Sequence, residues 1–573
     1  MKSNTTRVAL VPMPDPTIEE RYSLGTAYVA SALAADFARR GKDLDLSYLN
    51  DLDYAIHTPE QIAGAILKTR PEVVGLGLFA WNQHVARRVA GILRREDPSI
   101  LIVGGGPWVS SEGRSFAAAN PVIDVVIQGD GEVAFAEVVR RRTEGADTRG
   151  LSGIPGTVVR ADNGIVETEP VRVDPNSFPS PYLSGFVDAR FSIRVGIRRG
   201  CNQNCRYCNW GGGFSKPMTV DHLAADMKWA AKRGASEVWF VDSAINRRPA
   251  DLRRIASALD RMDEGDSLMT SALLDYRAID DERFELLRRC RLDSSDVGLQ
   301  SINPKALKIA GRWFDRRSFE TAVERLRSIG RVVVDIILGL PGDDPDGFRR
   351  TVDYLASLDV HVHMFLLMAL PGSDYSINRD KYGLNFNEDG VPFLLKSDSF
   401  TADDLVDCAA YFVTQSPRKS GGSDFTTANP RFSRYPYNYS VPMQAFQTAH
   451  ERYGDPLPPE PSVPGDKGRG DARKKLKGIL EDALGADVLS NGLRLGSIEA
   501  RITRVYNDRV QIDLTDGSGN GAEAFLRPRT QDAPAFMRAG PFDIWYIPDS
   551  GMAEEQVCHA IEMLAAIIES GGT

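Results

Sequence analysis

Cysteine and histidine are scarce in this sequence, which has six cysteines and seven histidines in 573 residues. So few cysteines do not form the dense disulfide framework of a small secreted protein. The sequence has no metal-binding histidine pair and no Ser/His/Asp set for nucleophilic catalysis. If the chain is an enzyme, its difficult chemistry is therefore expected to come from cofactors.

Long apolar runs and an excess of positive charge are also missing. No apolar run reaches about 18 residues, so no transmembrane helix is predicted. The net charge of −9 argues against nucleic acid as a main partner, because phosphate binding needs a basic surface. Near the N-terminus, Pro12, Pro14 and Pro16 interrupt a short apolar stretch, which favours a buried strand over a signal peptide. The length and an ordinary soluble composition predict three or four domains.

Three of the six cysteines are clustered. Cys201, Cys205 and Cys208 have the spacing C-x3-C-x2-C, and the aromatic Tyr207 precedes the third. Three thiolates on one loop can bind three irons of a [4Fe–4S] cluster and leave the fourth iron open as a reaction site. A zinc site is the alternative, but structural zinc needs a fourth ligand, and the nearest histidine, His222, lacks the usual paired spacing.

This cysteine segment resembles the cluster loop of radical S-adenosylmethionine (SAM) enzymes. The resemblance implies that Cys201, Cys205 and Cys208 bind a [4Fe–4S] cluster and that SAM chelates the open iron. It further implies reductive cleavage of SAM to a 5′-deoxyadenosyl radical. The remaining cysteines, Cys290, Cys408 and Cys558, are scattered and are interpreted as buried free thiols.

Residues 1–150 alternate short β-rich runs with amphipathic helical segments, which predicts a doubly wound, Rossmann-like parallel sheet. Ligands of such sheets bind at the carboxyl ends of the strands. Glycines there allow the backbone to approach a ligand, although a tight turn explains each glycine cluster equally well. Strands are predicted at Val8–Val11, Leu44–Leu49, Val73–Leu78, Ile100–Val103 and Val122–Ile127.

The order of the motifs at these strand ends resembles the cobalamin-binding domain found upstream of many radical SAM cores. The usual Asp-x-His-x-x-Gly signature is absent, so the resemblance does not support a histidine ligand below the cobalt. The alternative is a vestigial domain without a bound nucleotide. The resemblance makes candidates for cobalamin contacts of Phe79, Trp81, Asn82, Gly104, Gly105, Gly106, Pro107, Gly129, Gly131 and Glu132.

Residues 186–385 contain six predicted strand–helix units after the cysteine loop, which fits the partial (β/α)6 barrel of the radical SAM family. Catalytic groups of such barrels lie at the carboxyl ends of the strands. Asp275, Tyr276 and Tyr375 lie near predicted strand ends and are interpreted as polar groups of the barrel rim rather than substrate contacts. The family resemblance makes candidates for SAM contacts of Tyr207, Asn209, Trp210, Asp242, Ser243, Gln300, Ser301, Asp335, Gly339 and Pro341.

The other parts of the chain are less informative. Proline-rich residues 151–185 predict a linker with a short hairpin. Residues 386–465 are expected to cover the barrel mouth and to end in a proline-rich linker. Residues 466–573 predict a small α+β module, for which the sequence indicates no family.

A cobalamin domain before a radical SAM core resembles the cobalamin-dependent radical SAM family. The resemblance implies a C-methyltransferase acting on an unactivated or aromatic carbon of a specialised-metabolite, antibiotic-type intermediate, by radical or polar methyl transfer. The alternatives are a non-methylating rearrangement or cyclisation enzyme, and a cobalamin and Fe–S sensor without turnover. We further expect a cytoplasmic monomer that receives electrons from a flavodoxin- or ferredoxin-type donor, with a small-molecule substrate and neither nucleic acid nor membrane as a partner.

Overall fold

The structure is a computed structural model of the 573-residue chain. It describes residues 5–13, 22–52, 57–161, 164–189, 192–210, 213–263, 268–358, 360–388, 391–415 and 425–427, together with shorter segments between 493 and 566. The chain divides into two compact units. One comprises Met1–Leu49 and Arg70–Pro461, and the other comprises Asn50–Thr69 and Ser462–Thr573.

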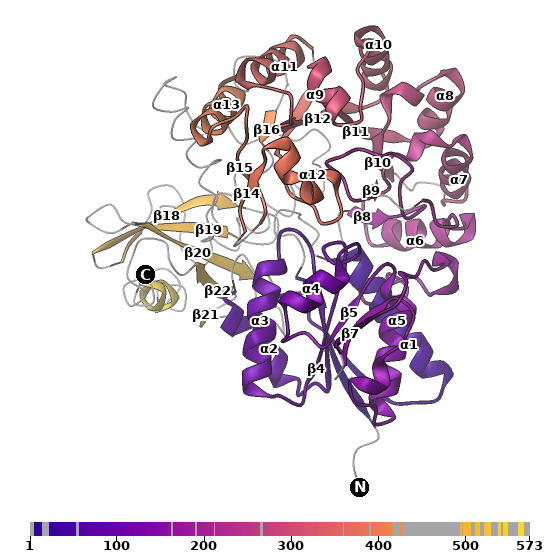
Figure 1. Ribbon diagram of the computed structural model, residues 1–573, viewed down its shortest axis with the longest axis vertical. Helices are drawn as coiled ribbons and strands as arrows, with labels where there is room; N and C mark the ends of the chain where they lie inside the picture. The colour runs from indigo at the N-terminus through magenta and orange to yellow at the C-terminus, as the bar shows by residue number, and fades with distance from the viewer. Residues whose placement is uncertain are drawn as a thin grey trace. The chain divides into compact units, whose positions relative to one another are not determined.

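A seven-stranded sheet forms the N-terminal part of the first unit, in the order β2-β1-β3-β4-β5-β6-β7 (Figure 1). The first five strands are parallel, and the hairpin of β6 and β7 adds to β5 in the antiparallel sense. The hairpin expected in the linker is therefore an edge of this sheet. The strands are β1 (Thr6–Val11), β2 (Leu44–Tyr48), β3 (Val73–Gly77), β4 (Leu101–Gly105), β5 (Val125–Ile127), β6 (Thr157–Ala161) and β7 (Gly164–Glu167).

Helices cover both faces of the sheet, as the doubly wound prediction requires. On one face, α1 (Leu24–Arg39) and α5 (Gly131–Thr143) share a core with β1, β3, β4 and β5. On the other face lie α3 (Gln83–Glu96) and α4 (Gly113–Ala119). The strand order 2-1-3-4-5 reverses direction between β1 and β3, and ligands of doubly wound sheets bind at the carboxyl end of such a reversal.

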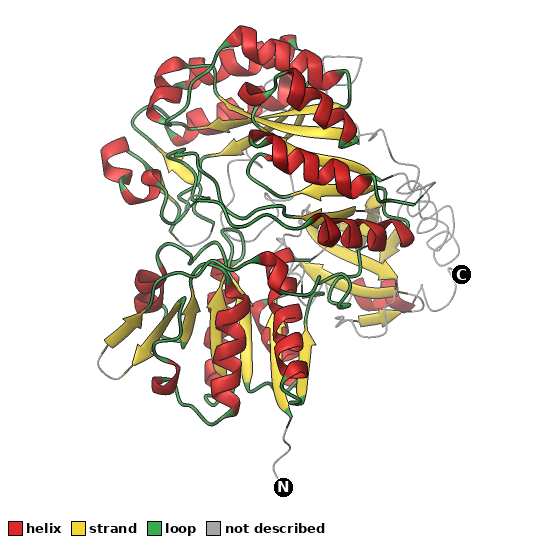
Figure 2. Cartoon of the chain, turned by 90° about the vertical axis from the view of Figure 1, so that its right-hand side faces the viewer, coloured by secondary structure: helices red, strands yellow, loops and turns green. Residues whose placement is uncertain are grey.

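The second sheet of this unit is the predicted parallel barrel sheet (Figure 2). Its strand order is β16-β13-β12-β11-β10-β9-β8, and every pairing is parallel. Six strands were predicted, and β16 (Phe425–Thr427) adds to the edge of β13. The six are β8 (Ser192–Val195), β9 (Glu237–Phe240), β10 (Met269–Leu274), β11 (Leu292–Gln300), β12 (Arg331–Leu338) and β13 (His361–Leu366).

The helices between these strands pack their apolar faces on the outside of the sheet. Several begin at a capping side chain: Thr219, Asp315 and Asp344 each accept a hydrogen bond from a backbone N–H in the first turn. They are α6 (Val220–Lys232), α7 (Pro249–Leu259), α8 (Asp281–Arg289), α9 (Pro304–Ile309), α10 (Arg316–Arg327) and α11 (Pro345–Ser357).

After β13 the chain forms α12 (Asp374–Ile377), the small sheet of β14 (Asn385–Phe386) and β15 (Leu394–Lys396), and α13 (Ala402–Gln415). Because side chains alternate along a strand, Val334 and Ile336 of β12 join the core under the helices, whereas Val333 and Asp335 point to the opposite, concave face. That concave face is where a barrel of this kind holds its ligands.

The second unit contains an antiparallel sheet of six described strands, in the order β17-β18-β19-β20-β22-β21. It also includes α2 (Pro59–Lys68), and residues 560–566 are helical. The proline-rich linker expected before 465 lies outside the described residues. The strands are β17 (Leu493–Leu495), β18 (Ile498–Val505), β19 (Val510–Thr515), β20 (Gly521–Pro528), β21 (Met537–Ala539) and β22 (Phe542–Ile547).

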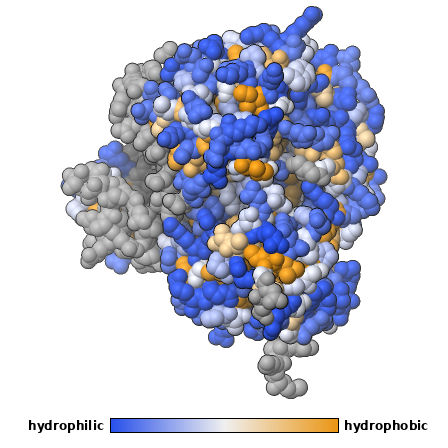
Figure 3. Space-filling model, viewed as in Figure 1, coloured by the Kyte–Doolittle hydropathy of each residue, from blue (hydrophilic) through white to orange (hydrophobic). Residues whose placement is uncertain are grey.

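The visible surface in Figure 3 is mostly hydrophilic, with small and scattered hydrophobic patches. None of the described helices combines the length and the apolar character that a membrane crossing requires.

Candidate active site

The loop after β8 brings the three predicted cluster cysteines together. Cys201, Cys205 and Cys208 are half-buried and free. The sulfurs of Cys201 and Cys208 each accept a backbone N–H, from Gln203 and Trp210, at 3.4 Å. Burial raises the pKa of Cys208, and the neighbouring cysteines raise it further. Three thiolates this close together repel one another. A positively charged partner such as iron would stabilise them.

Arg312 supplies a fixed positive charge beside this loop. Its Nη1 donates to the sulfur of Cys205 at 3.6 Å and to Oε1 of Gln203 at 3.3 Å. Gln203 also accepts a hydrogen bond from Arg277 at 3.2 Å. An arginine N–H group that points at a thiolate stabilises its negative charge. Arg312 therefore favours the deprotonated, negatively charged form of Cys205.

Asp275 belongs to the same arginine-rich region. It accepts hydrogen bonds from Arg277 at 2.7 Å and from Arg247 at 2.9 Å. Burial raises the pKa of Asp275, but Arg277 outweighs this effect and the net pKa is lowered. The side chain is a paired carboxylate of the barrel rim, in agreement with its interpretation from the sequence. Tyr276 is similarly satisfied, because its hydroxyl donates to the carbonyl of Trp313 at 3.3 Å.

Asp242 and Ser243, predicted to contact SAM, hold the segment that leads into the cysteine loop. Asp242 accepts the backbone N–H of Ile197 at 2.8 Å and of Arg198 at 2.7 Å. Ser243 donates to the carbonyl of Gly200 at 3.4 Å. Burial raises the pKa of Asp242 to about 7, although both backbone bonds lower it. Both side chains thus position the first cysteine, whether or not they also touch a ligand.

Gln300 and Ser301 end β11 in two different environments. Gln300 has φ 73°, a left-handed backbone conformation that is strained for a residue with a side chain. Ser301 is buried and donates to Oδ2 of Asp343 at 2.9 Å, which ties β11 to the turn after β12. Of this predicted pair, Gln300 therefore has a strained backbone, and Ser301 has an internal hydrogen-bond partner.

The other predicted SAM residues lie around the same strand ends. Asn209 donates to the carbonyl of Pro371 at 3.2 Å. Trp210 is 43% exposed, which leaves its ring available for a ligand. Burial raises the pKa of Tyr207 above its usual value, and this side chain lies beside Cys205. In the turn after β12, Pro341 is buried and Gly339 has φ 91°, where a Cβ would meet Leu394 at 2.4 Å.

At the reversal point of the N-terminal sheet, Asn82 joins two loops. Its side chain donates to the carbonyl of Met13, which follows β1, at 3.0 Å. The same side chain accepts the backbone N–H of Phe79, which follows β3, at 2.8 Å. Phe79 and Trp81 stack, with ring centroids 4.7 Å apart and planes inclined by 12°. The predicted aromatic pair thus forms one flat surface at the edge where a ligand is expected.

Several of the glycines predicted to contact cobalamin are required by the packing of the fold itself. At Gly106, with φ 134°, a Cβ would lie 2.5 Å from the carbonyl oxygen of Leu78. At Gly129, with φ 77°, a Cβ would lie 2.5 Å from the carbonyl oxygen of Val171. Close packing against neighbouring backbone therefore explains these two without a ligand. Gly104 is also tight, with Leu78 2.7 Å from a Cβ, whereas Gly105 and Gly131 have more room, and Pro107 is exposed.

Arg199, which the sequence interpretation missed, connects the cysteine loop to the turn before α5. Its guanidinium donates to both oxygens of Glu132, and its Nη1 lies 3.1 Å from Oδ1 of Asp130. Burial lowers the pKa of Arg199, but Glu132 and Asp130 outweigh this effect and raise it. Glu132, predicted to contact cobalamin, is thus an internal partner of the residue two positions before Cys201.

A second connection joins the loop after β4 to the turn after β13. Ser111 donates to the carbonyl of Pro371 at 2.8 Å, and Glu112 accepts the backbone N–H of Gly372 at 2.9 Å. Because Asn209 of the cysteine loop donates to the same carbonyl of Pro371, three segments meet there. Next to this turn, Tyr375 is fully buried, and no described residue hydrogen-bonds its hydroxyl.

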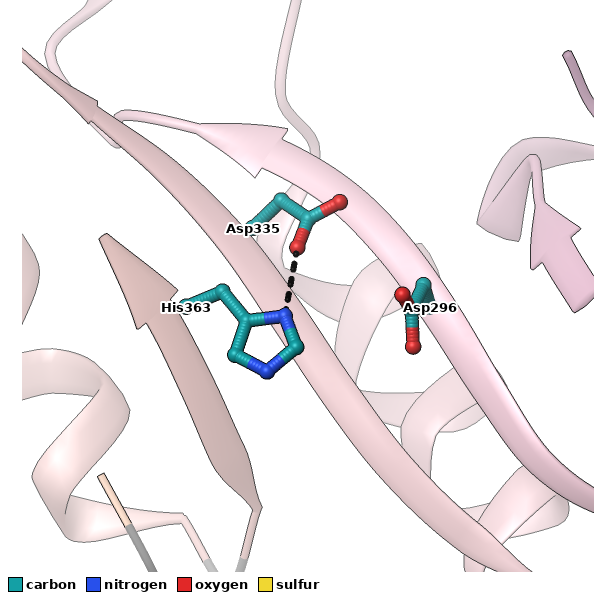
Figure 4. A group of neighbouring side chains, drawn as sticks. All are labelled: Asp296, Asp335 and His363. Atoms are coloured by element: carbon teal, nitrogen blue, oxygen red, sulfur yellow. Dashed lines mark ion pairs between the residues drawn. The ribbon is translucent and has the colours of Figure 1, made fainter. Parts of the chain in front are cut away.

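Three polar side chains meet on the concave face of the barrel sheet: Asp296 of β11, Asp335 of β12 and His363 of β13 (Figure 4). Nδ1 of His363 lies 3.5 Å from Oδ1 of Asp335. Burial lowers the pKa of His363, but Asp335 outweighs this effect and raises it. Burial and the nearby Asp335 raise the pKa of Asp296 to about 7. Of the three, the sequence interpretation had selected Asp335 alone.

Two family models match this chain. The B12 binding domain matches residues 20–139, and the radical SAM superfamily matches residues 195–355. Together the two matches are the domain pair of the cobalamin-dependent radical SAM family. The first match ends within α5, and the second runs from the end of β8 through the cysteine loop and β9 to β12. The cofactors are accordingly a [4Fe–4S] cluster, SAM and cobalamin.

Two relatives of this chain are named methyltransferases. A 2-(S-pantetheinyl)-carbapenam-3-carboxylate methyltransferase of Streptantibioticus cattleyicolor is 24% identical in an alignment of 390 residues, and the match covers 60% of this chain and 56% of that protein. The cobalamin-dependent radical SAM methyltransferase TokK of Streptomyces tokunonensis is 25% identical in an alignment of 345 residues, and the match covers 56% of this chain and 46% of TokK. The chain thus spans about half the length of each.

Among solved structures, similar folds are found in two proteins. TsrM of Kitasatospora setae, described with tryptophan substrate and a SAM analogue, has a TM-score of 0.56 and 16% identity, over 79% of this chain and 100% of TsrM. The cobalamin-dependent SAM radical enzyme OxsB has a TM-score of 0.54 and 14% identity, over 72% of this chain and 66% of OxsB. At these identities the comparison shows a shared fold.

The described residues fit the three cofactors. Three free cysteines, two N–H···S bonds and Arg312 suit an iron–sulfur cluster. Trp210 and the strained Gln300 suit a ligand such as SAM over the strand ends. At the other edge, Nε1 of Trp81 is buried without a hydrogen-bond partner among the described residues, so it can donate to a large ligand such as cobalamin.

Proposed function

We propose that this protein is a cobalamin-dependent radical SAM C-methyltransferase whose substrate is a specialised-metabolite intermediate of the antibiotic type. The carbon that it methylates is unactivated or aromatic. The proposal includes radical and polar methyl transfer, because the described residues are compatible with both.

The observation that carries the proposal is the ion pair of Arg199 with Glu132 and Asp130. It joins the start of the cysteine loop to the turn that begins α5 of the B12-binding region. A methyl group can pass between two cofactors only if the substrate meets both. The hydrogen bonds of Ser111 and Glu112 with the turn after β13 favour the same arrangement.

The names of the relatives support a methyl transfer and a small substrate. One is named for a carbapenam carboxylate, and TsrM is described with tryptophan as substrate. Both substrates are small molecules of amino-acid size or a few times larger. We therefore propose a small, functionalised molecule as the substrate of this enzyme.

Each group of residues has a distinct role in this proposal. When bound, the cluster with SAM supplies the means to activate an inert C–H bond, and cobalamin supplies the methyl group. The cysteines bind the cluster, and Arg312 stabilises the thiolate of Cys205. Asp242 and Ser243 hold the loop in place. The stacked rings of Phe79 and Trp81 exclude water from the edge at which cobalamin is proposed to bind.

The cellular setting follows from the same chemistry. We propose that an external donor of the flavodoxin or ferredoxin type reduces the cluster. An oxygen-sensitive cluster needs reducing surroundings, so we propose a cytoplasmic location for a monomeric enzyme.

The proposal can be tested without knowing the substrate. The reconstituted holoenzyme is reduced anaerobically and mixed with SAM that carries a deuterated methyl group. We expect S-adenosylhomocysteine, measured by liquid chromatography and mass spectrometry, and recovery of the deuterium label in the cobalamin fraction. Protein reconstituted without cobalamin serves as the control and should give no labelled cobalamin.

Two other outcomes separate the alternatives. Formation of 5′-deoxyadenosine without S-adenosylhomocysteine would indicate a non-methylating reaction such as a rearrangement. If neither product exceeds the protein-free control, the chain is a binding protein and the proposed activity is wrong.

A further inference from the structure

Asp335 is a candidate SAM contact from the sequence, but the cluster that it forms with Asp296 and His363 has no role in the function proposed above. The three side chains come from adjacent strands that are paired in parallel, and Asp335 lies directly beside His363 in the register. Asp296 lies two residues before Gly298, the register partner of Asp335, and therefore points to the same face of the sheet. Figure 4 shows the three side chains gathered on that face.

A structural salt bridge explains only two of the three residues. Asp335 and His363 form an ion pair at 3.5 Å. Asp296 is 8% exposed, and among the described residues it has neither a hydrogen-bond partner nor an ion-pair partner. A mostly buried carboxylate without a protein partner is costly, because little water is left to solvate its charge. Its presence indicates that something absent from the protein chain binds there.

The geometry favours a cation bound by all three groups. One ligand atom from each residue can be chosen so that all three lie within 4.8 Å of one another. Two donor atoms on one transition-metal ion are at most about 4.2 Å apart, since each metal–ligand bond is about 2.1 Å. Small side-chain adjustments therefore bring the three atoms onto one ion. One imidazole nitrogen and two carboxylate oxygens form a donor set for zinc or iron(II) rather than for magnesium or calcium.

The charges around the cluster agree with a divalent ion. Glu237 and Arg331 are the other charged groups that act on Asp296. Arg331 donates its Nε hydrogen bond to Ser294 at 3.3 Å, and the hydroxyl of Ser271 donates to Glu237. Asp296, Asp335 and Glu237 thus bring three carboxyl groups to this region, against one guanidinium and one imidazole. A divalent cation that binds there replaces the protons on these carboxyl groups as their positive partner.

We propose that Asp296, Asp335 and His363 bind a divalent transition-metal ion, with zinc as the probe, in the interior of the barrel. The site is separate from the iron–sulfur cluster, since it uses none of the cysteines. Its three protein donors leave at least one coordination position open for water or for a ligand atom. The side chain of His363 is 32% exposed, which gives an ion access to the site. The proposal does not depend on methyl transfer.

The test is a metal count on the full-length holoprotein. Protein with a reconstituted cluster is passed over a chelating resin, mixed with zinc sulfate and desalted. Zinc and iron are then measured together by mass spectrometry. We expect about one zinc per chain in the wild type. We expect at least a tenfold loss of bound zinc in Asp296→Asn and in His363→Gln, with the iron content unchanged.

Asp293→Asn is the matched control, because Asp293 lies on the same strand but is exposed on its surface. This variant should keep its zinc. Thermal unfolding provides a second readout: zinc should raise the Tm of the wild type and of Asp293→Asn, and should not change the Tm of the other two variants. A wild type that retains no zinc overturns the proposal, and so does retention of zinc by either Asp296→Asn or His363→Gln.

Discussion

Arg199 and Glu132 form a two-pronged ion pair although 67 residues separate them in the sequence. The side chain of Glu132 is 2% exposed, so its charge depends on Arg199 for compensation. This pair connects a residue just before the cluster cysteines to the first turn of α5.

Arg199→Met should lower the stability of the protein by about 3–5 kcal/mol, because it leaves Glu132 buried without its cation. Chemical denaturation measures the effect. Glu132→Gln combined with Arg199→Met should restore part of the loss, since the double variant removes the unpaired charge of Glu132. If the double variant is less stable than the two single losses added together, the pair is not the coupling contact described above.

Cys205→Ala should abolish the iron–sulfur absorbance of the reconstituted protein, because two remaining thiolates on the loop cannot hold the cluster. Absorbance spectra and iron counts after anaerobic reconstitution check this outcome. Cys290→Ala is the control: Cys290 is fully buried away from the loop, and its removal should leave the cluster intact. Full absorbance in Cys205→Ala would mean that the cluster is bound elsewhere.

Arg312→Met should shift the reduction potential of the cluster to a more negative value. Loss of the guanidinium beside Cys205 removes a positive charge and an N–H···S bond, both of which favour the reduced cluster. Potentiometric titration followed by electron paramagnetic resonance measures the shift. Arg316→Met removes an exposed charge from α10 and should leave the potential unchanged. Equal potentials in wild type and Arg312→Met would exclude this role.

Asn82→Ala should weaken cobalamin binding at least tenfold and lower stability by about 1–3 kcal/mol, because it unties the loops after β1 and β3 and leaves their buried backbone groups unsatisfied. Equilibrium dialysis with cobalamin measures the affinity. The control is Asn120→Ala, which removes a hydrogen bond to Phe116 at the end of α4. A loss of affinity as large in the control would show that general destabilisation, not the loop connection, is responsible.

Asp226 predicts a pH dependence of stability. Burial raises its pKa to about 7, and the nearby Ser180 only partly opposes this shift. The folded state therefore keeps a proton that the unfolded state has lost. This contribution to stability is complete below pH 3.8, the ordinary pKa, and it disappears as the pH rises through 7.

Asp226→Asn should therefore be more stable than the wild type at pH 8, by up to about 4 kcal/mol, and similar to it below pH 4. Denaturant unfolding at several pH values tests this difference. Asp293→Asn, at an exposed position, should follow the wild-type curve. If the stability of the wild type and of Asp226→Asn changed with pH in the same way, the raised pKa would not belong to Asp226.

Local sequence patterns were sufficient for much of the fold. The β-rich runs at Val73–Leu78 and Val332–Leu338 correspond to β3 and β12, because hydrophobic runs between turns specify buried parallel strands. The cysteine spacing likewise identified one loop on which three thiols meet. In both cases the information lies within a few consecutive residues.

Contacts between distant segments could not be predicted in this way. Arg199 lacks a motif of its own and is paired with Glu132 only by the fold. His363 and Asp296 lie 67 positions apart, and they meet because β11, β12 and β13 are neighbours in the same register. One feature of the sequence could have indicated the cluster: its members are polar residues in the middle of otherwise apolar, buried strands. The sequence also could not separate ligand contacts from internal partners, as Ser301 and its bond to Asp343 illustrate.

One group of hydrogen bonds bears on the order in which the cofactors bind. These are the bonds that Ser111, Glu112 and Asn209 make to Pro371 and Gly372. They join the segments after β4, after β13 and around the cysteines through the protein chain itself. The gap between the two ligand-binding edges is then set before any cofactor arrives. Cluster and cobalamin should consequently load independently and in either order, and enzyme assembled by the two routes should be the same.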